Sequence, residues 1–400
     1  MEIKAEVDRQ LGIIERNAET VLPRDELARK IERSLRQERP LRAKLGIDPS
    51  ASQLTLGHAV VLRKLRAFQD LGHTAVLVVG DFTRRIGDPS GKSKTREPMS
   101  PEEIERNMRT YKEQAFRILD PRRAEVRYNS EWLEKLTLAQ VVGLTARYTV
   151  ARMLEREDFQ RRFRDGSAIT IMEFLYPLAQ AYDSVAVRAD VELGGSDQRF
   201  NLLIGRDIQE AYGQDPQVIV TMPLLIGTDG AFAMSQSRGN YIGVAEEPEE
   251  QFGKIMSLPD ELMPQYCQLL TDVRWEELAG LHPKEAKKRL ARSLVAWLHG
   301  EEGAQRGQEH FERVFEDEQP PEEMPEVAVG RLLDRDDTVN IVDLLVEAGM
   351  VSSRSEARRL VDGGGVELDG ERVKSSRDRV TVRAGAILRA GKLRFARLVV

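Results

Sequence analysis

The chain has 400 residues, of which 41% are hydrophobic and 32% charged, with a net charge of −6. This length indicates two or three globular domains, and the acidic balance argues against a protein that coats nucleic acid non-specifically. A single cysteine, Cys267, excludes an internal disulfide and a cysteine-based metal cluster, so we expect a reducing compartment and no protein-bound metal. The sequence contains no apolar run of ~18 residues and begins with acidic residues, which predicts a cytoplasmic protein without a membrane span.

The charge is distributed unevenly along the chain. Residues 338–400 carry a net charge of +4, which leaves −10 for residues 1–337. An acidic body followed by a basic tail domain suggests a dedicated module that binds a polyanion.

An amphipathic helix is expected over 3–20, and after it a strand, a tight turn and a helix start fall close together in the segment KLGIDPSASQLTLGH. The apolar run at 41–48 predicts the strand, and apolar residues at helical spacing predict the helix over 56–71. Gly57 and His58 therefore begin a helix at the carboxyl end of a strand, where free N–H groups hold phosphate and a histidine can donate to it. The same residues fit any strand–turn–helix unit with His58 as a cap.

The apolar run TAVLVV at 74–79 predicts a second strand, which completes a β–α–β unit. A loop rich in turn residues and cations follows at 81–98 and includes Lys92 and Arg96. Such a loop suits the clamping of a polyphosphate, although a solvated basic loop has the same composition. Helical spacing returns over 131–165, a segment that suits a subunit interface as well as a core.

Three polar side chains, Tyr176, Gln180 and Asp183, share one face of an otherwise apolar helix, which favours a pocket over a solvent-facing stripe. A strand predicted over 187–193 then runs into the sequence GGSDQ, which opens another helix. The aspartate of this turn, Asp197, is placed to bind ribose hydroxyls.

The chain resembles the bacterial tyrosyl-tRNA synthetases of class I in five segments that keep their order and spacing: IDPSASQLTLGH, IGDPSGKSKTR, FLYPLAQAYDS, VELGGSDQRFN and AMSQSRGNYIG. The first two segments mark only the class, whereas the Tyr176/Gln180/Asp183 face and GGSDQ belong to the tyrosine branch. The resemblance runs from about residue 20 to the end of the sequence.

The resemblance implies an α/β fold in which a Rossmann-type parallel sheet forms the catalytic domain, at 1–245, with a dimer-interface insertion. An α-helical anticodon-binding domain at 246–330 and a small α+β, S4-like RNA-binding domain at 338–400 would follow. The implied protein is a homodimer that uses L-tyrosine, ATP with Mg²⁺ and tRNA(Tyr), and has no membrane partner.

The implied reaction joins the carboxylate of tyrosine to the α-phosphate of ATP and then transfers the aminoacyl group to tRNA, by positioning and charge stabilisation. Asp183 would bind the phenol hydroxyl. The resemblance assigns tyrosine to Lys44, Asp88, Tyr176, Gln180, Asp183 and Gln198. It assigns ATP to Gly46, Asp48, Gly57, His58, Gly195, Asp197, Met234, Ser235 and Gln236. The catalytic group would be Thr55, His58, Lys92, Arg96 and Gln236, with Lys92 and Arg96 on the leaving pyrophosphate.

Three features depart from the pattern of that family. Thr55 replaces the first histidine of the HIGH-type signature, and the sequence AMSQS at 233–237 lacks both lysines of the KMSKS signature. Lys44 stands where part of the family has a tyrosine that shares the phenol contact. The missing lysines leave open a catalytically weakened paralogue that binds RNA or tyrosine, and a ligase for a modified aromatic amino acid is a further alternative.

Beyond an acidic, proline-containing linker at 316–337, a capping box starts a helix that leaves Arg354, Arg358 and Arg359 facing outward. A hairpin is expected at 366–374. A basic helix beside a β-turn resembles the αL RNA-binding motif of a small-subunit ribosomal protein. The three arginines are therefore the expected RNA-binding residues.

Overall fold

The computed structural model describes residues 2–49, 52–89, 100–315, 324–334, 338–391 and 394–400. The chain divides into two compact units, Met1–Ala304 and Gln305–Val400. No helix among the described residues is long and apolar enough to cross a membrane. The expected division into three domains stays a prediction, because the helices that follow residue 246 begin within the same unit as the large sheet.

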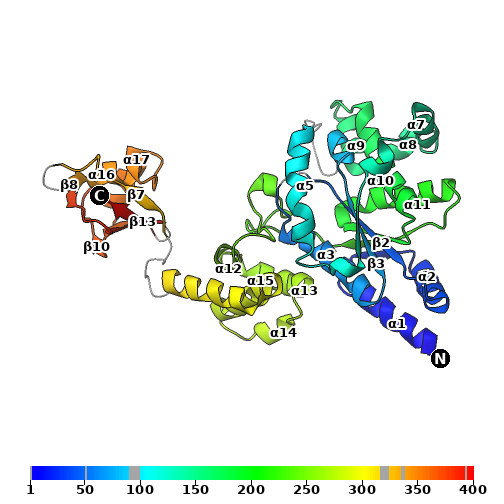
Figure 1. Cartoon of the computed structure of the whole chain (residues 1–400), viewed down its shortest axis with the longest axis horizontal. Helices are drawn as coiled ribbons and strands as arrows, with labels where there is room; N and C mark the ends of the chain where they lie inside the picture. Colours follow the sequence, from blue (N-terminus) through cyan, green and yellow to red (C-terminus); the bar gives the residue numbers. More distant parts are fainter. Residues whose placement is uncertain (1, 50–51, 90–99, 316–323, 335–337, 392–393) are drawn as a thin grey trace. The chain divides into compact units, whose positions relative to one another are not determined.

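A six-stranded sheet organises the first unit (Figure 1). Its strands lie in the order β1-β6-β5-β2-β3-β4, and all neighbours are parallel except β1 and β6. The strands are β1 (Thr20–Leu22), β2 (Arg42–Ile47), β3 (Thr74–Val79), β4 (Ala124–Tyr128), β5 (Val191–Gly195) and β6 (Val218–Met222). Runs such as TAVLVV in β3, buried at five of six positions, explain why this parallel sheet forms.

The direction in which strands are added to the sheet reverses at β2. From β2 the chain adds β3 and β4 on one side, then returns to add β5 and β6 on the other. In open α/β sheets such a reversal leaves a crevice beyond the carboxyl ends of the two central strands. The residues that follow β2 and β5 are therefore brought to one place.

Helices flank this sheet, and α10 packs along α11 (Figure 1). The helices before the last strand are α1 (Glu2–Glu15), α2 (Arg24–Gln37), α3 (Leu56–Asp70), α4 (Thr83–Ile86), α5 (Pro101–Ala115), α6 (Ser130–Leu133), α7 (Leu138–Thr145), α8 (Val150–Met153), α9 (Glu157–Arg164), α10 (Ile171–Val187) and α11 (Arg199–Ala211). Those after it are α12 (Pro248–Met256), α13 (Met263–Leu270), α14 (Trp275–Leu278) and α15 (Pro283–Phe315), which is interrupted at Gly300.

The strand predicted over 187–193 is wrong in its first residues. Helix α10 continues to Val187, which is buried at the helix end, and Arg188 adopts a left-handed conformation with φ of 50° as the C-cap. Strand β5 begins only at Val191. The alternation of apolar residues suited a strand, but burial of the last helical turn decided the boundary. The helix expected over 3–20 likewise ends at Glu15, and β1 follows it.

The second unit contains a five-stranded sheet in the order β10-β9-β12-β13-β7 and a two-stranded sheet of β8 and β11. Its elements are β7 (Glu326–Ala328), β8 (Thr338–Asn340), α16 (Ile341–Glu347), α17 (Arg354–Asp362), β9 (Val366–Leu368), β10 (Glu371–Arg372), β11 (Arg379–Thr381), β12 (Ile387–Ala390) and β13 (Arg394–Val399). The expected hairpin is confirmed as β9 and β10, joined by Asp369 and Gly370 with positive φ. Arg358 and Arg359 are exposed on α17, and Arg354 pairs with Asp343 at 2.7 Å.

Candidate active site

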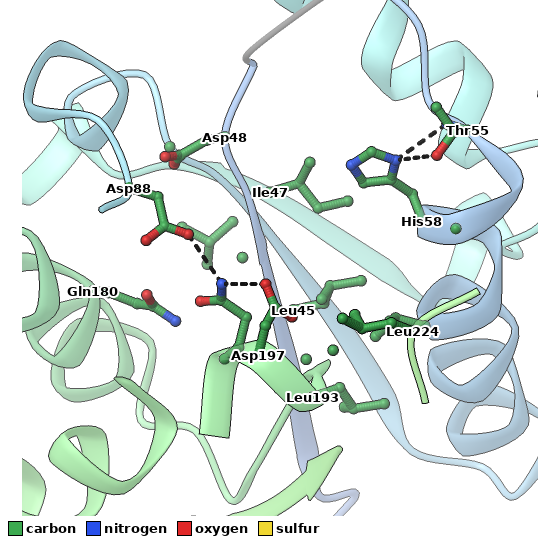
Figure 2. Close-up of a pocket in the computed structure, with 18 of the residues that line it drawn as sticks. Leu45, Ile47, Asp48, Thr55, His58, Asp88, Gln180, Leu193, Asp197 and Leu224 are labelled. Carbon is green, nitrogen blue, oxygen red and sulfur yellow. Dashed lines mark hydrogen bonds between the residues drawn. The ribbon is translucent and has the colours of Figure 1, made fainter. Parts of the chain in front are cut away.

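A cavity of about 290 Å³ lies where the reversal of strand order predicts a crevice (Figure 2). Its walls come from the ends of β2 and β5, the start of α3 and one face of α10. The cavity brings together most of the residues that the sequence singled out: Gly46, Asp48, Thr55, Gly57, His58, Asp88, Tyr176, Gln180, Asp183, Gly195, Asp197, Gln198 and Met234.

Lys44 does not line the cavity, because its side chain is wholly buried behind the wall. Its ammonium group lies 2.9 Å from Glu192 Oε1 and donates to Ser184 Oγ at 2.8 Å and to the Gln180 carbonyl at 3.0 Å. A ligand in the cavity therefore meets α10 before it meets Lys44.

The AMSQS segment reaches the cavity only through Ala233 and Met234. The Gln236 amide donates to the backbone carbonyl of Gln53, and the Ser235 N–H donates to Asn240 Oδ1 at 2.8 Å. Ser235 and Gln236, which the resemblance assigned to ATP, are therefore not among the residues that line the cavity. The loop residues Lys92 and Arg96 lie outside the described residues.

His58 lies in the first turn of α3 and takes part in its N-terminal cap. Its Nδ1 accepts the Thr55 backbone N–H at 3.1 Å, and Thr55 Oγ1 lies 2.9 Å from the same nitrogen (Figure 2). Burial lowers the pKa of His58 to about 4, so the ring is neutral near pH 7. Since Nδ1 accepts a backbone hydrogen, the proton of the neutral ring is on Nε2, which makes Nε2 a hydrogen-bond donor. The sequence suggested that His58 is either a helix cap or a donor to phosphate. The ring can do both, because Nδ1 takes part in the cap and Nε2 carries the proton.

Asp183 is a buried carboxylate held by two residues that the sequence reasoning missed. The Trp132 indole Nε1–H donates to Asp183 Oδ1 at 2.8 Å, and Asn129 Nδ2 donates to Oδ2 at 3.2 Å. Burial raises the pKa of Asp183 to about 7, although the charge of Lys44 and these two hydrogen bonds oppose the shift. Nothing in the local pattern marks Asn129 and Trp132, because their role depends on contact with a helix about fifty residues away.

Asp48 follows β2 and shares this acidic surrounding. Thr83 Oγ1 donates to Asp48 Oδ1 at 2.8 Å, and the Tyr176 hydroxyl donates to Oδ2 at 2.9 Å. Burial, with a contribution from the negative charge of Asp88, raises the pKa of Asp48 to about 6. Gly80 lies against this group, since a Cβ at position 80 would overlap Asp48 Oδ1 and Thr83 Oγ1.

Four carboxyl groups reach the cavity, from Asp48, Asp88, Asp183 and Asp197. They provide hydrogen-bond acceptors for a cationic amine and for hydroxyl groups, whereas His58 and the N-terminus of α3 provide donors for an anion. Among the described residues, no group of three or more histidines, cysteines and acids is placed to hold a metal ion. The arrangement therefore suits a ligand with an amine, hydroxyls and a phosphate.

Comparison with known proteins agrees with this chemistry. Residues 36–316 match the family described as tRNA synthetases class I (W and Y), and residues 339–385 match the S4 domain. The tyrosine–tRNA ligase of Thermotoga maritima is 52% identical over 400 residues, covering 98% of this chain and 97% of the relative. That of Moorella thermoacetica is also 52% identical, covering 99% and 97%.

Among solved structures, a C-terminally truncated mitochondrial tyrosyl-tRNA synthetase from Aspergillus nidulans superposes with a TM-score of 0.66 at 21% identity. The match covers 78% of this chain and 98% of that one. At this identity the likeness concerns the fold, and it confirms the α/β class predicted from the sequence.

Gly80→Ala tests the packing around Asp48. We expect the free energy of unfolding to fall by about 1–3 kcal/mol, because the added methyl group overpacks a buried site. Gly46→Ala is the matched control, since a Cβ at position 46 meets no atom within 4 Å and the protein should unfold at an unchanged or slightly higher temperature. Thermal unfolding of both variants measures the difference, and equal midpoints would contradict the packing described here.

Proposed function

Because the chain belongs to the tyrosine–tRNA ligases of class I, we propose that it activates L-tyrosine with ATP and transfers the tyrosyl group to tRNA(Tyr). The observation that supports this most directly is the union of two sites in one cavity. Asp183 offers a buried acceptor for a phenol hydroxyl, and the start of α3 offers donors for phosphate.

Tyrosine is bound along the face of α10 that lines the cavity. Its phenol hydroxyl donates to Asp183, and its ammonium group lies among Asp88, Tyr176 and Gln180. The Tyr176 hydroxyl spends its proton on Asp48, so its oxygen is left to accept from the ammonium group. The aromatic ring fits between these polar ends against the apolar residues of β2 and β5, such as Leu45 and Leu193.

ATP, as its Mg²⁺ complex, is the second substrate. The space beside Gly46 holds no protein atom within 4 Å of a Cβ position, so a ligand can approach the backbone there. Gly57 and Gly195 also line the cavity, and a Cβ at position 195 would crowd Asp197 and Leu224. Asp197 accepts from ribose hydroxyls. The tyrosine carboxylate attacks the α-phosphate, the bond to pyrophosphate breaks, and the neutral His58 donates from Nε2 to phosphate oxygen.

Two other surfaces support binding of tRNA and formation of a homodimer. The S4 domain carries Arg358 and Arg359 on an exposed helix face, which supports binding of tRNA through phosphates and shape. In the first unit, apolar side chains of the segment from α7 to the start of α10 are exposed, which supports a homodimer formed through this segment. These side chains are Leu138, Val142, Val150, Phe163 and Ile171.

Tyrosine-dependent exchange between ATP and pyrophosphate tests the first step, and charging of tRNA(Tyr) tests the second. A protein that binds tyrosine or RNA without activating it shows no exchange. Complete absence of exchange would therefore contradict the proposal and favour the weakened paralogue. Exchange with a substituted tyrosine, but none with tyrosine itself, would indicate the ligase for a modified amino acid.

Tyrosine binding should depend on pH through Asp183. An ionised carboxylate accepts the phenol proton more strongly than a carboxylic acid does. As the pH falls through about 7, Asp183 takes up a proton, so affinity should decline by up to about tenfold per pH unit. Phenylalanine is the control ligand, because it lacks the hydroxyl and its weaker binding should not follow this titration.

Asp183→Asn should remove both the pH dependence and most of the preference for tyrosine over phenylalanine. A site built to bond a hydroxyl rejects the analogue that lacks it, a rule for which tyrosyl-tRNA synthetases are themselves a standard example. Equilibrium dialysis between pH 5.5 and 8 with ~0.5-unit steps measures these affinities. If the variant retains the tyrosine preference, Asp183 is not the phenol acceptor.

Gln236→Lys should raise the rate of adenylate formation and leave the tyrosine dissociation constant nearly unchanged. A lysine here can engage the leaving pyrophosphate as charge develops, whereas a glutamine donates without charge. A hydrogen bond to a charged group contributes roughly 1.5–3 kcal/mol, so the gain should be about ten- to a hundredfold.

Single-turnover adenylate formation measures this gain. Ala231→Lys is the matched control, because it adds the same charge to an exposed position of the same loop that does not line the cavity. The prediction fails if Gln236→Lys brings no increase, which would mean that another cation already serves the pyrophosphate.

A further inference from the structure

We propose that Arg156 and Asn201 are positioning residues that fix the amide orientation of Gln180 and Gln198 and thereby create the ammonium site for the amino acid. This inference rests on the proposed function, since it concerns how the same cavity recognises one group of tyrosine. Neither residue lines the cavity, and both are buried, with exposed fractions of 6% and 1%.

The four side chains of Arg156, Asn201, Gln198 and Asp88 form a closed ring of polar contacts. Arg156 Nη1 donates to Asn201 Oδ1 at 3.1 Å, and Asn201 Nδ2 donates to Gln198 Oε1 at 3.0 Å. Gln198 Nε2 donates to Asp88 Oδ2 at 3.0 Å, and Asp88 Oδ1 lies 3.5 Å from Arg156 Nη2. Gln180 joins this ring, because its Oε1 accepts from Asn201 Nδ2 at 3.1 Å.

The direction of every amide in the ring follows from Arg156. A guanidinium group has donors and no acceptor, so only the oxygen of Asn201 can face it. The Asn201 NH₂ group then faces the two glutamines and can meet only their oxygens. Arg156 is itself held in place, because its Nε lies 2.8 Å from Asp158 and its guanidinium stacks over the Phe159 ring at 5.3 Å.

The outer ends of both glutamines confirm this direction. Gln198 Nε2 faces the carboxylates of Asp88 and Asp197, and Gln180 Nε2 lies 3.4 Å from Glu192 Oε1. Gln180 and Asp88 both line the cavity, so the ring fixes the orientation of two side chains whose oxygen atoms can serve as acceptors there. An ammonium group carries three donors and requires such acceptors, whereas a carboxylate or an aromatic ring does not.

Asn201→Asp tests the inference with a nearly isosteric change. An aspartate at position 201 has no NH₂ group, so both glutamines gain by turning their own NH₂ groups toward it, and Gln198 then presents oxygen to Asp88. We expect the dissociation constant for L-tyrosine to rise about ten- to a hundredfold, as for the loss of a charged hydrogen bond. The affinity for 3-(4-hydroxyphenyl)propionate, which lacks the amino group, should change less than about threefold.

Calorimetric titration of the full chain with both ligands gives the ratio of affinities, which a general loss of structure would not change selectively. Gln209→Glu is the matched control, because Gln209 is equally buried on α11 but donates to carbonyls of α10 and Ala189 outside the cavity. This control should change the two affinities by the same factor. Arg156→Met, which removes the donor that faces Asn201, should reproduce the selective loss, and Arg156→Lys should restore part of it.

Equal weakening of both ligands by Asn201→Asp, or by Arg156→Met if the first variant does not fold, would overturn the inference. Failure of the unchanged protein to bind L-tyrosine would instead overturn the proposed function. The two failures are therefore distinguishable in one set of titrations.

Discussion

A buried ion pair with no access to water links β2 to β5. Lys44 and Glu192 face each other in the register of these strands, lie 2.9 Å apart and are 0% and 1% exposed. Loss of one partner would leave an isolated buried charge, a change that costs about 3–5 kcal/mol. A shift of one residue would send the two side chains to opposite faces of the sheet. The pair therefore fixes where Asp48 and Gly195, at the ends of these strands, meet across the cavity.

The cavity that results is acidic, and the carboxyl groups of Asp183 and Asp48 accept hydrogen bonds from neutral donors. Asp183 accepts hydrogen bonds from an indole and an amide, and Asp48 accepts hydrogen bonds from two hydroxyl groups. Such donors satisfy the oxygen atoms but supply little compensating charge, so burial still raises the pKa of Asp183 to about 7 and the pKa of Asp48 to about 6. A ligand that carries a positive charge and hydroxyl protons complements these carboxyl groups. For the proposed reaction, this predicts that electrostatic complementarity contributes to selection of the amino acid.

Local patterns predicted the elements that build this site and left out the contacts between them. The strand at β2, the helix at α3 and the polar face of α10 follow from periodicity, and their order in an α/β sheet brings their ends together. The sequence did not predict the roles of four residues, because each acts through a side chain that is distant in sequence. These residues are Asn129, Trp132, Arg156 and Asn201. A polar residue whose partner is unknown looks like a surface residue in a sequence, and only packing shows that these four are inside or against the core.

The hydrogen bond at His58 Nδ1 restricts how protons can move in the proposed reaction. Because the Thr55 backbone N–H occupies Nδ1, the ring cannot exchange tautomers without losing a hydrogen bond that caps α3. This prevents the ring from accepting a proton on one nitrogen and releasing a proton from the other. In the proposed reaction, His58 therefore serves as a fixed hydrogen-bond donor and not as a proton shuttle. In the proposed activation step the nucleophile must therefore arrive already deprotonated, a condition that the carboxylate of an amino acid meets at neutral pH.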